Sequence, residues 1–477
     1  MGRDRNSVSP SESGISGLRP ASGRQSIITG PLRSTLFFLA LPVLCEQLLN
    51  SFIGLFDTYL AGNLKSGNTV AATSAVGLAA YVGWLSSMIA MLVGTGTTAL
   101  VARYAGRGEH EEANRFANQS MTMALGLGVG LFALFFVLAP GLARYCRMTD
   151  EAFDITVNYL RTDAVGHFFM SITLVGSAAL RGVGNMRTPM LIFTLINAVN
   201  VVASYSYVYG VGAFPEMGVR GIVAGTLTAR IFGAALMLFV LFRGNRGVAL
   251  RLHELIPLWK RVRRILRIGI PAAADGAILW SGHFIFLAIV ARLAAEPLGP
   301  AYFAAHIIAI RVEAFTYLPA TAWAAALATM IGQSLGAEKP ERAIRAGHEA
   351  VLQCGLLSVA VSLGFYFGAS GIFHLMTADE LVRQVGVRPF RILALLQPTL
   401  VVAIIYIGGL RGAGDTRSPL IITVIGAIIR IPTGAFFGLY LGGGLMGAWI
   451  GMFAEMIWRA IGAAAWFVHG SWRKKRV

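Results

Sequence analysis

The sequence predicts an all-α polytopic membrane protein with twelve transmembrane helices in two pseudo-symmetric six-helix lobes. Hydrophobic residues make up 56% of the 477-residue chain and charged residues only 13%, about half the ~25% of an ordinary soluble domain. Apolar segments long enough to cross a bilayer recur along the chain. The motif LRGVGNMRTPM at 180–190 returns as LRGAGDTRSPL at 410–420, so the chain is built from two similar halves.

The expected helices follow from apolar segments of ~20 residues or more. We expect them near residues 34–62, 74–101, 117–141, 157–180, 188–210, 217–242, 266–294, 300–332, 347–375, 388–410, 418–440 and 445–468. The first lobe then covers 31–242 and the second 266–468. The remaining segments are polar or basic: a disordered tail rich in Ser, Gly, Pro and Arg at 1–30, a linker between the lobes at 243–265, and a tail at 469–477.

Shorter motifs repeat at the same offset. Pro42-Val-Leu-Cys-Glu46 corresponds to Pro271-Ala-Ala-Ala-Asp275, and GRGEHEEA at 106–113 corresponds to GAEKPERA at 336–343. A chain of two membrane-embedded halves is typical of transporters whose pathway lies between two bundles.

The distribution of Lys and Arg predicts the orientation. Most of them fall on the side that holds both termini and the connection between the halves, so we expect both termini in the cytoplasm. This topology accounts for the net charge of +17 without a nucleic-acid partner. We expect the basic linker to lie along the inner leaflet, where anionic lipids attract it.

Several of these segments resemble one family. The first helix, LALPVLCEQLLNSFIGLFDTYLAG, the repeated LRGxGxxRxP loops, GQSLGA at 332–337 and GVRGIVAGT at 218–226 are similar to segments of the multidrug and toxic compound extrusion (MATE) family. The resemblance covers residues from about 34 to 468. It implies a V-shaped pair of lobes in the cell (inner) membrane, a monomer, and efflux of drugs or other organic compounds driven by a proton or sodium gradient.

Asp57 is the strongest candidate for binding the coupling cation. An intramembrane carboxylate is costly in lipid, so it either serves a pathway or is held by neighbouring hydroxyls. The resemblance implies a cation site of Asp57 with Asn200 and Thr226. Where the family has a second carboxylate this chain has Ser204. A proton needs a single base, whereas sodium prefers several oxygen ligands. This favours proton coupling, and sodium held by the same residues and backbone carbonyls remains open.

A second group of residues is predicted to line the substrate cavity. Glu46 lies eleven residues before Asp57 and on nearly the same helix face, and Asp275 occupies the equivalent place in the second half. Either these carboxylates attract cationic drugs or each pairs with a local polar group. The other predicted cavity residues are Gln47, Phe56 and Tyr59.

The second half lacks the cation-site residues. Its equivalents of Asp57 and Asn200 are Phe286 and Arg430. We expect Arg430 to form a structural ion pair with Glu455, because an unpaired buried guanidinium is very costly. Among the remaining polar residues, we expect Asp163 and Arg161 at a membrane interface. We expect three histidines to be packing residues or proton relays: His167, His283 and His306.

Other function classes are poorly supported. There is no GxxxxGK[ST] nucleotide-binding loop, no Ser-His-Asp or zinc spacing, and no metal or redox spacing among the three cysteines. We therefore expect neither an enzyme nor a cofactor, only a coupling ion, small organic substrates and membrane lipids. The alternative is a flippase for lipid-linked oligosaccharides, which shares the two-lobe plan. Its cavity should be lined with Arg and Lys, whereas the first half presents Glu46 and Asp57.

Overall fold

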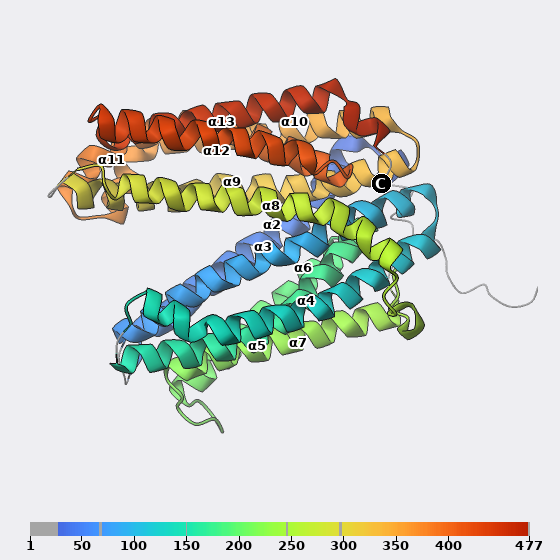
Figure 1. Ribbon diagram of the computed structural model, residues 1–477, viewed down its shortest axis with the longest axis horizontal. Helices are drawn as coiled ribbons and strands as arrows, with labels where there is room; N and C mark the ends of the chain where they lie inside the picture. The colour runs from blue at the N-terminus through green and yellow to red at the C-terminus, as the bar shows by residue number, and fades with distance from the viewer. Residues whose placement is uncertain (1–26, 66–68, 149, 245–246, 295–297, 476–477) are drawn as a thin grey trace, which may run out of the picture.

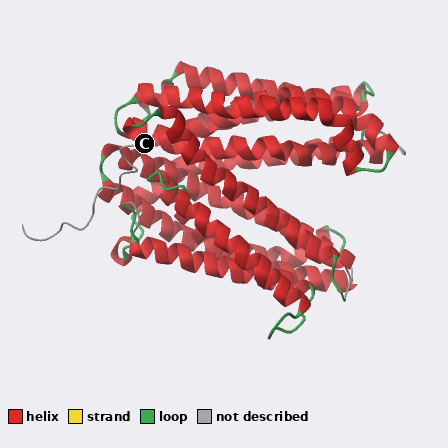
Figure 2. Ribbon diagram, turned by 180° about the vertical axis from the view of Figure 1, so that it is seen from behind, coloured by secondary structure: helices red, strands yellow, loops and turns green. Residues whose placement is uncertain are grey.

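Twelve long helices follow one another in the computed structural model, which describes residues 27–65, 69–148, 150–244, 247–294 and 298–475. No strand occurs among these residues (Figure 2). The helices are α2 (Leu32–Gly62), α3 (Thr69–Arg107), α4 (His110–Tyr145), α5 (Asp150–Gly182), α6 (Arg187–Tyr209), α7 (Val219–Arg243), α8 (Trp259–Val290), α9 (Leu298–Gly336), α10 (Pro340–Met376), α11 (Glu380–Gly412), α12 (Arg417–Ala435) and α13 (Gly444–His469). Short helical turns are η1 (Leu252–Glu254), η2 (Phe436–Tyr440) and η3 (Ser471–Lys474).

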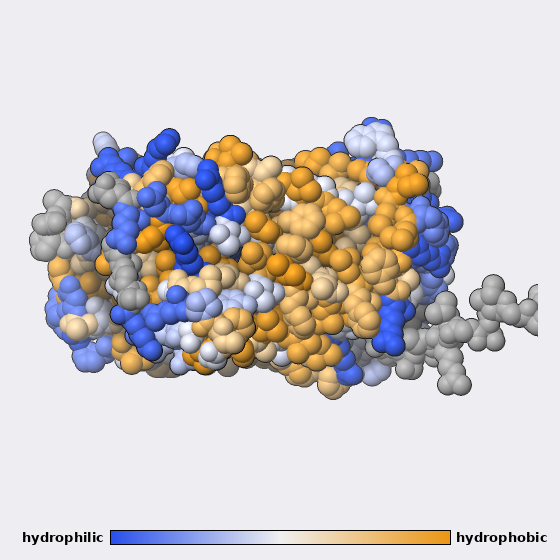
Figure 3. All heavy atoms as spheres, turned by 90° about the horizontal axis from the view of Figure 1, so that it is seen from below, coloured by the Kyte–Doolittle hydropathy of each residue, from blue (hydrophilic) through white to orange (hydrophobic). Residues whose placement is uncertain are grey.

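The helices have the length and composition of membrane spans. Eleven of those described are long and apolar enough to cross a bilayer. The other, α13, has 26 residues and carries Glu455 and Arg459. In Figure 3 apolar side chains form a broad middle band, and hydrophilic ones gather toward the two ends. The protein is therefore a multi-pass membrane protein.

The helices form two lobes, α2–α7 and α8–α13, which meet at one end and diverge at the other (Figure 1). We call these the closed end and the open end. The first and last described residues both lie at the closed end, where Arg342 of α10 donates a hydrogen bond to the carbonyl of Ile27 and Arg103 of α3 donates one to the carbonyl of Lys475. The prediction of two six-helix lobes in an all-α membrane fold is confirmed.

The repeated LRGxG motif builds the same helix end in both lobes. Gly184 follows α5 with φ +82° and Gly414 follows α11 with φ +85°, a left-handed conformation that favours glycine. The next residue returns its backbone N–H to the carbonyl of Leu180 in one lobe and of Leu410 in the other. The motif thus ends one long helix and starts the next.

Glycines allow the lobes to touch at the closed end. A Cβ atom added at Gly106 of α3 would collide with the backbone of Gln333 in α9, and one added at Gly336 of α9 would collide with the backbone of Arg103 in α3. Small residues are what permits such close approach of membrane helices. Gly106 and Gly336 are equivalent positions of the repeat, so the two helices cross with approximate two-fold symmetry.

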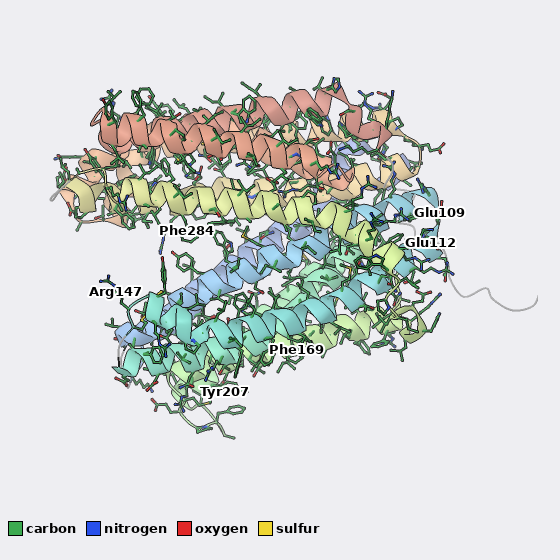
Figure 4. All side chains as sticks on the ribbon, in the orientation of Figure 1. Glu109, Glu112, Arg147, Phe169, Tyr207 and Phe284 are labelled. Carbon is green, nitrogen blue, oxygen red and sulfur yellow. The ribbon has the colours of Figure 1, made fainter. Side chains whose placement is uncertain are left out.

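The linker between the lobes is shorter than the predicted 243–265, because α8 already begins at Trp259. The segment before it is held by α4. Asn114 accepts a hydrogen bond from the backbone of Ala249 at 2.7 Å, and Gln119 accepts one from Leu258 at 2.7 Å. Glu112, near the start of α4 at the closed end (Figure 4), pairs with Arg261 at 3.2 Å. Side chains of α4 therefore fix where the second lobe begins.

Where the terminal segments are described, they are packed against the rest of the protein. Trp472 in η3 is fully buried, and its ring stacks on Phe467 with centroids 4.9 Å apart. At the other terminus Ile27 is 2% exposed. Most of the predicted disordered tail at 1–30, together with residues 476–477, lies outside the described residues.

Candidate functional site

Asp57, the predicted cation-binding carboxylate, is buried in the first lobe. It lies on α2 with 9% of its surface exposed. Thr226 of α7 donates a hydrogen bond to its Oδ2 at 3.3 Å, and Asn200 of α6 donates one to the Thr226 hydroxyl at 3.0 Å. Three residues far apart in the sequence thus meet as the resemblance implied. Among the described residues, Oδ1 of Asp57 and the side-chain oxygen of Asn200 have no hydrogen-bond partner.

Ser204 is close to this group but has a different partner. Its hydroxyl donates a hydrogen bond to the carbonyl of Ile222 in α7 at 3.4 Å. A Cβ atom at Gly225 would collide with the same side chain, so Ser204 packs directly on the α7 backbone. Its predicted part in holding a cation stays a prediction, whereas its contact with α7 is a packing role.

We predicted Asp163 at a membrane interface. The structure instead buries it within the first lobe, next to Arg230 of α7. It is 4% exposed on α5, and its Oδ1 lies 2.7 Å from Nη1 of Arg230 on α7. Its Oδ2 lies 3.0 Å from Nε2 of His167, one helical turn away. Arg230 lies one helical turn after Thr226, the residue that donates a hydrogen bond to Asp57. The prediction was wrong because it considered only the place of Asp163 near the end of an expected span. It did not consider the ion-pair partner on another helix, Arg230.

A sequence signal for this charged group existed. Asp163 and His167 are four residues apart, as are Asn200 and Ser204, and Thr226 and Arg230. Residues at this spacing share a helix face. Three consecutive helices therefore each present a polar pair, and the helix face of α7 that carries Thr226 also carries Arg230.

The two other acidic candidates each have an arginine partner. Glu46 of α2 forms an ion pair with Arg181 of α5, and Asp275 of α8 forms one with Arg411 of α11. Both carboxylates are 3% exposed. The arginines belong to the repeated LRG motif, so the pairs are equivalent in the two lobes. The sequence left open whether these carboxylates attract cationic drugs or pair with a local polar group. The structure contains the pairing. A neutralised carboxylate attracts cationic drugs weakly.

The remaining predicted cavity residues lie on α2 with different exposure. Tyr59 is 61% exposed, and Phe56 stacks against Phe52 with ring centroids 6.4 Å apart. Gln47 is half-buried. Across the lobe boundary, Phe284 of α8 contacts Tyr81 of α3 and lies on the side of α8 that faces the first lobe (Figure 4). Aromatic side chains of both lobes thus face the space between them.

The second lobe contains a separate buried polar group. Arg430 and Glu455, predicted to pair, lie 3.1 Å apart and are 3% and 4% exposed. The guanidinium also lies over the ring of Phe286, 4.3 Å from its centroid. His283 contacts the carbonyl of Leu279 at 2.9 Å. These contacts are those of a structural cluster that neutralises its own charges.

Comparison with known proteins identifies the family. The model of the MatE family matches residues 42–206 and again residues 271–436, in agreement with the internal repeat. The chain belongs to the MatE family. It is 30% identical over 447 residues to "Probable multidrug resistance protein NorM" of Thermotoga maritima, which covers 94% of each chain. It is 22% identical over 420 residues to the "FAD transporter" of Shewanella oneidensis, covering 88% of this chain and 91% of that one.

Solved structures agree on the fold. A "Crystal structure of MATE in the straight conformation" superposes with a TM-score of 0.86, at 23% identity, over 96% of this chain and 100% of the other. A "Crystal structure of MATE in the bent conformation" superposes with a TM-score of 0.85, at 22% identity, over 95% and 97%. The two-lobe architecture of this MatE chain is therefore that of MATE proteins.

Proposed function

We propose that this chain is a secondary active efflux antiporter that exports cationic or amphipathic organic compounds in exchange for protons. The observation that supports this most directly is the buried carboxylate of Asp57, joined through Thr226 to Asn200. Such a group changes charge by taking up one ion from the membrane pathway. Similarity to "Probable multidrug resistance protein NorM" supports the choice of substrate class.

The coupling step uses the position of Asp57. Its unpartnered Oδ1 accepts the proton that enters from the open end, which we place outside the cell. Protonation removes the charge from α2 and changes its packing against α6 and α7. The drug then binds less tightly and leaves, and inward opening releases the proton to the cytoplasm. In this cycle the chain works as a monomer in the inner membrane, with both termini cytoplasmic.

Apolar contacts supply the substrate binding. The exposed aromatic side chains at the lobe boundary include Tyr81 at 57% and Phe284 at 51%. Aromatic surfaces accept organic cations through their π faces and neutral compounds through contact area. A broad substrate range follows, without a fixed set of polar contacts.

The flippase alternative has less support. A site for anionic lipid carriers needs free basic side chains, but Arg181 and Arg411 are each occupied by a carboxylate. We therefore favour drug export over lipid flipping.

The test is export of a fluorescent organic cation from proteoliposomes under an imposed pH gradient. We expect the Asp57→Asn variant to insert in the membrane but to lose gradient-driven export, because its neutral side chain can no longer release and rebind a proton. Ser51→Ala, which changes an exposed side chain on the same helix, is the matched control and should export normally. Unchanged export by Asp57→Asn contradicts the proposal.

A further inference from the structure

Asp57 shares its surroundings with a permanent positive charge. Arg230 lies four residues after Thr226 on α7, so the two side chains share a face and are about 6 Å apart along the axis. Its side chain is 18% exposed, and Thr226, one helical turn before it, donates its hydrogen bond to Oδ2 of Asp57. A cation entering the site to bind Asp57 therefore meets a resident cation.

Arg230 is held in place on several sides. Its Nη1 lies 2.7 Å from Oδ1 of Asp163 and 3.4 Å from the Asp163 carbonyl. A Cβ atom on Gly166 would lie 2.6 Å from the same Nη1, so the glycine leaves the room that the guanidinium fills. His167 occupies the other oxygen of Asp163 at 3.0 Å. These contacts with α5 fix the position of the guanidinium.

The charges determine which ion the site can hold. With Asp57 and Asp163 both ionised, the site has two negative charges, and Arg230 cancels one of them. His167 of α5 lies beside the same carboxylate as Arg230, 3.0 Å from Oδ2 of Asp163, and α6 contributes the neutral Asn200 and Ser204. A sodium ion needs several oxygen ligands and benefits from two carboxylates. A proton needs only the free oxygen of Asp57.

We propose that Arg230, which forms an ion pair with Asp163, makes the site selective for protons. It does so because it occupies the carboxylate that would complete a sodium site. Arg230 is then a specificity-determining residue that acts as a fixed substitute for a bound cation. This inference rests on the proposed antiport function and gives a structural reason for its coupling to protons. It also accounts for Ser204 on α6, which stands where the family has a second carboxylate. A proton needs only one carboxylate that is not paired with a cation, and Asp57 provides it.

The decisive variant is Arg230→Gln, which frees Asp163 while keeping a polar side chain. We expect the variant to gain sodium-driven export of the fluorescent cation at least about tenfold above the rate of wild type, which should stay at the rate measured without a gradient, because a like charge is removed from the site. In detergent, NaCl should raise the melting temperature of Arg230→Gln relative to the same concentration of choline chloride, because sodium replaces the lost guanidinium. Wild type should show no such difference.

Two control variants separate this effect from general damage. The double variant Arg230→Gln/Asp163→Asn removes both charges and should show no sodium effect, in export or in melting temperature. Arg230→Lys keeps the charge and should stay driven by the pH gradient alone. A sodium effect in the double variant equal to that in Arg230→Gln contradicts the inference.

The outcomes distinguish the inference from the antiport proposal. Wild type that exports under neither gradient refutes the antiport proposal. Wild type that exports under a sodium gradient refutes the inference and the choice of protons as coupling ion but leaves antiport standing, and this arm needs no variant that must fold. Arg230→Gln that is folded, driven by protons and indifferent to sodium also refutes the inference alone.

Discussion

Charged residues inside the membrane region of this protein are arranged in pairs. Asp163 pairs with Arg230, Arg430 pairs with Glu455, and the acidic residues of α2 and α8 pair with the LRG arginines. An unpaired charge is costly in lipid. Asp57 departs from this rule, because its bonded partner, Thr226, is neutral. Glu313 of α9 departs from it too, because its bonded partner is the neutral Gln397.

At residue scale, the pair of Glu46 and Arg181 predicts a structural phenotype. Replacing Glu46 with Gln leaves the guanidinium without its anion and should lower the free energy of unfolding by about 2 kcal/mol, the usual cost of a lost charged hydrogen bond. Thermal unfolding of the purified protein measures this. Export of cationic and neutral dyes should fall equally. A loss confined to cationic dyes would assign Glu46 to substrate binding instead.

At the scale of elements, the C-terminal segment connects the two lobes at the closed end. Lys475 binds Asp415, in the loop between α11 and α12, at 2.5 Å, and its carbonyl accepts a hydrogen bond from Arg103 of α3 at 3.2 Å. Trp466 and Ser418 also donate hydrogen bonds to Asp415. The tail therefore stabilises the closed end.

This tether predicts a pH dependence of stability. Burial acts to raise the pKa of Asp415, but the hydrogen bonds from Lys475, Ser418 and Trp466 and the Lys475 charge hold it below its ordinary value of 3.8. The stabilisation is thus present above pH 3.8 and is lost as the pH falls through the lower pKa of the folded protein. Asp415→Asn should cost about 1 kcal/mol at pH 7, and this cost should shrink as the pH falls below 3.8. Melting temperatures of both proteins across this range test it, and a constant difference would contradict it.

At the scale of the whole molecule, transport requires the closed end to open and re-form. Its contacts come from both lobes: Thr329 and Gln333 of α9 donate hydrogen bonds to the carbonyls of Arg181 and Gly182 at 3.0 and 2.9 Å. The glycine crossing of α3 and α9 brings these groups within reach. These contacts hold the lobes in the conformation that is open at the opposite end.

Substitution of the crossing glycine should shift the balance between conformations. Gly106→Val places a side chain where the backbone of Gln333 lies, so the closed end cannot form and export should be lost. Distances between spin labels placed on the two lobes at this end should lengthen. Gly126→Val on α4, where an added Cβ meets nothing within 4 Å, is the control and should leave both readouts unchanged. Normal closure of Gly106→Val would contradict this account of the interface.

The sequence by itself determined the helices, the two-lobe repeat and the meeting of Asp57, Asn200 and Thr226. Apolar length, the repeat offset and the resemblance were sufficient because helices form from local patterns. The pair of Arg430 and Glu455 was predicted, but the tertiary structure decided the partners of the other charges. Arg230 and Asp163 are 67 residues apart, and Lys475 and Asp415 lie on separate segments. Periodicity gives the face on which a residue lies, but only the packing of helices against one another decides which faces meet.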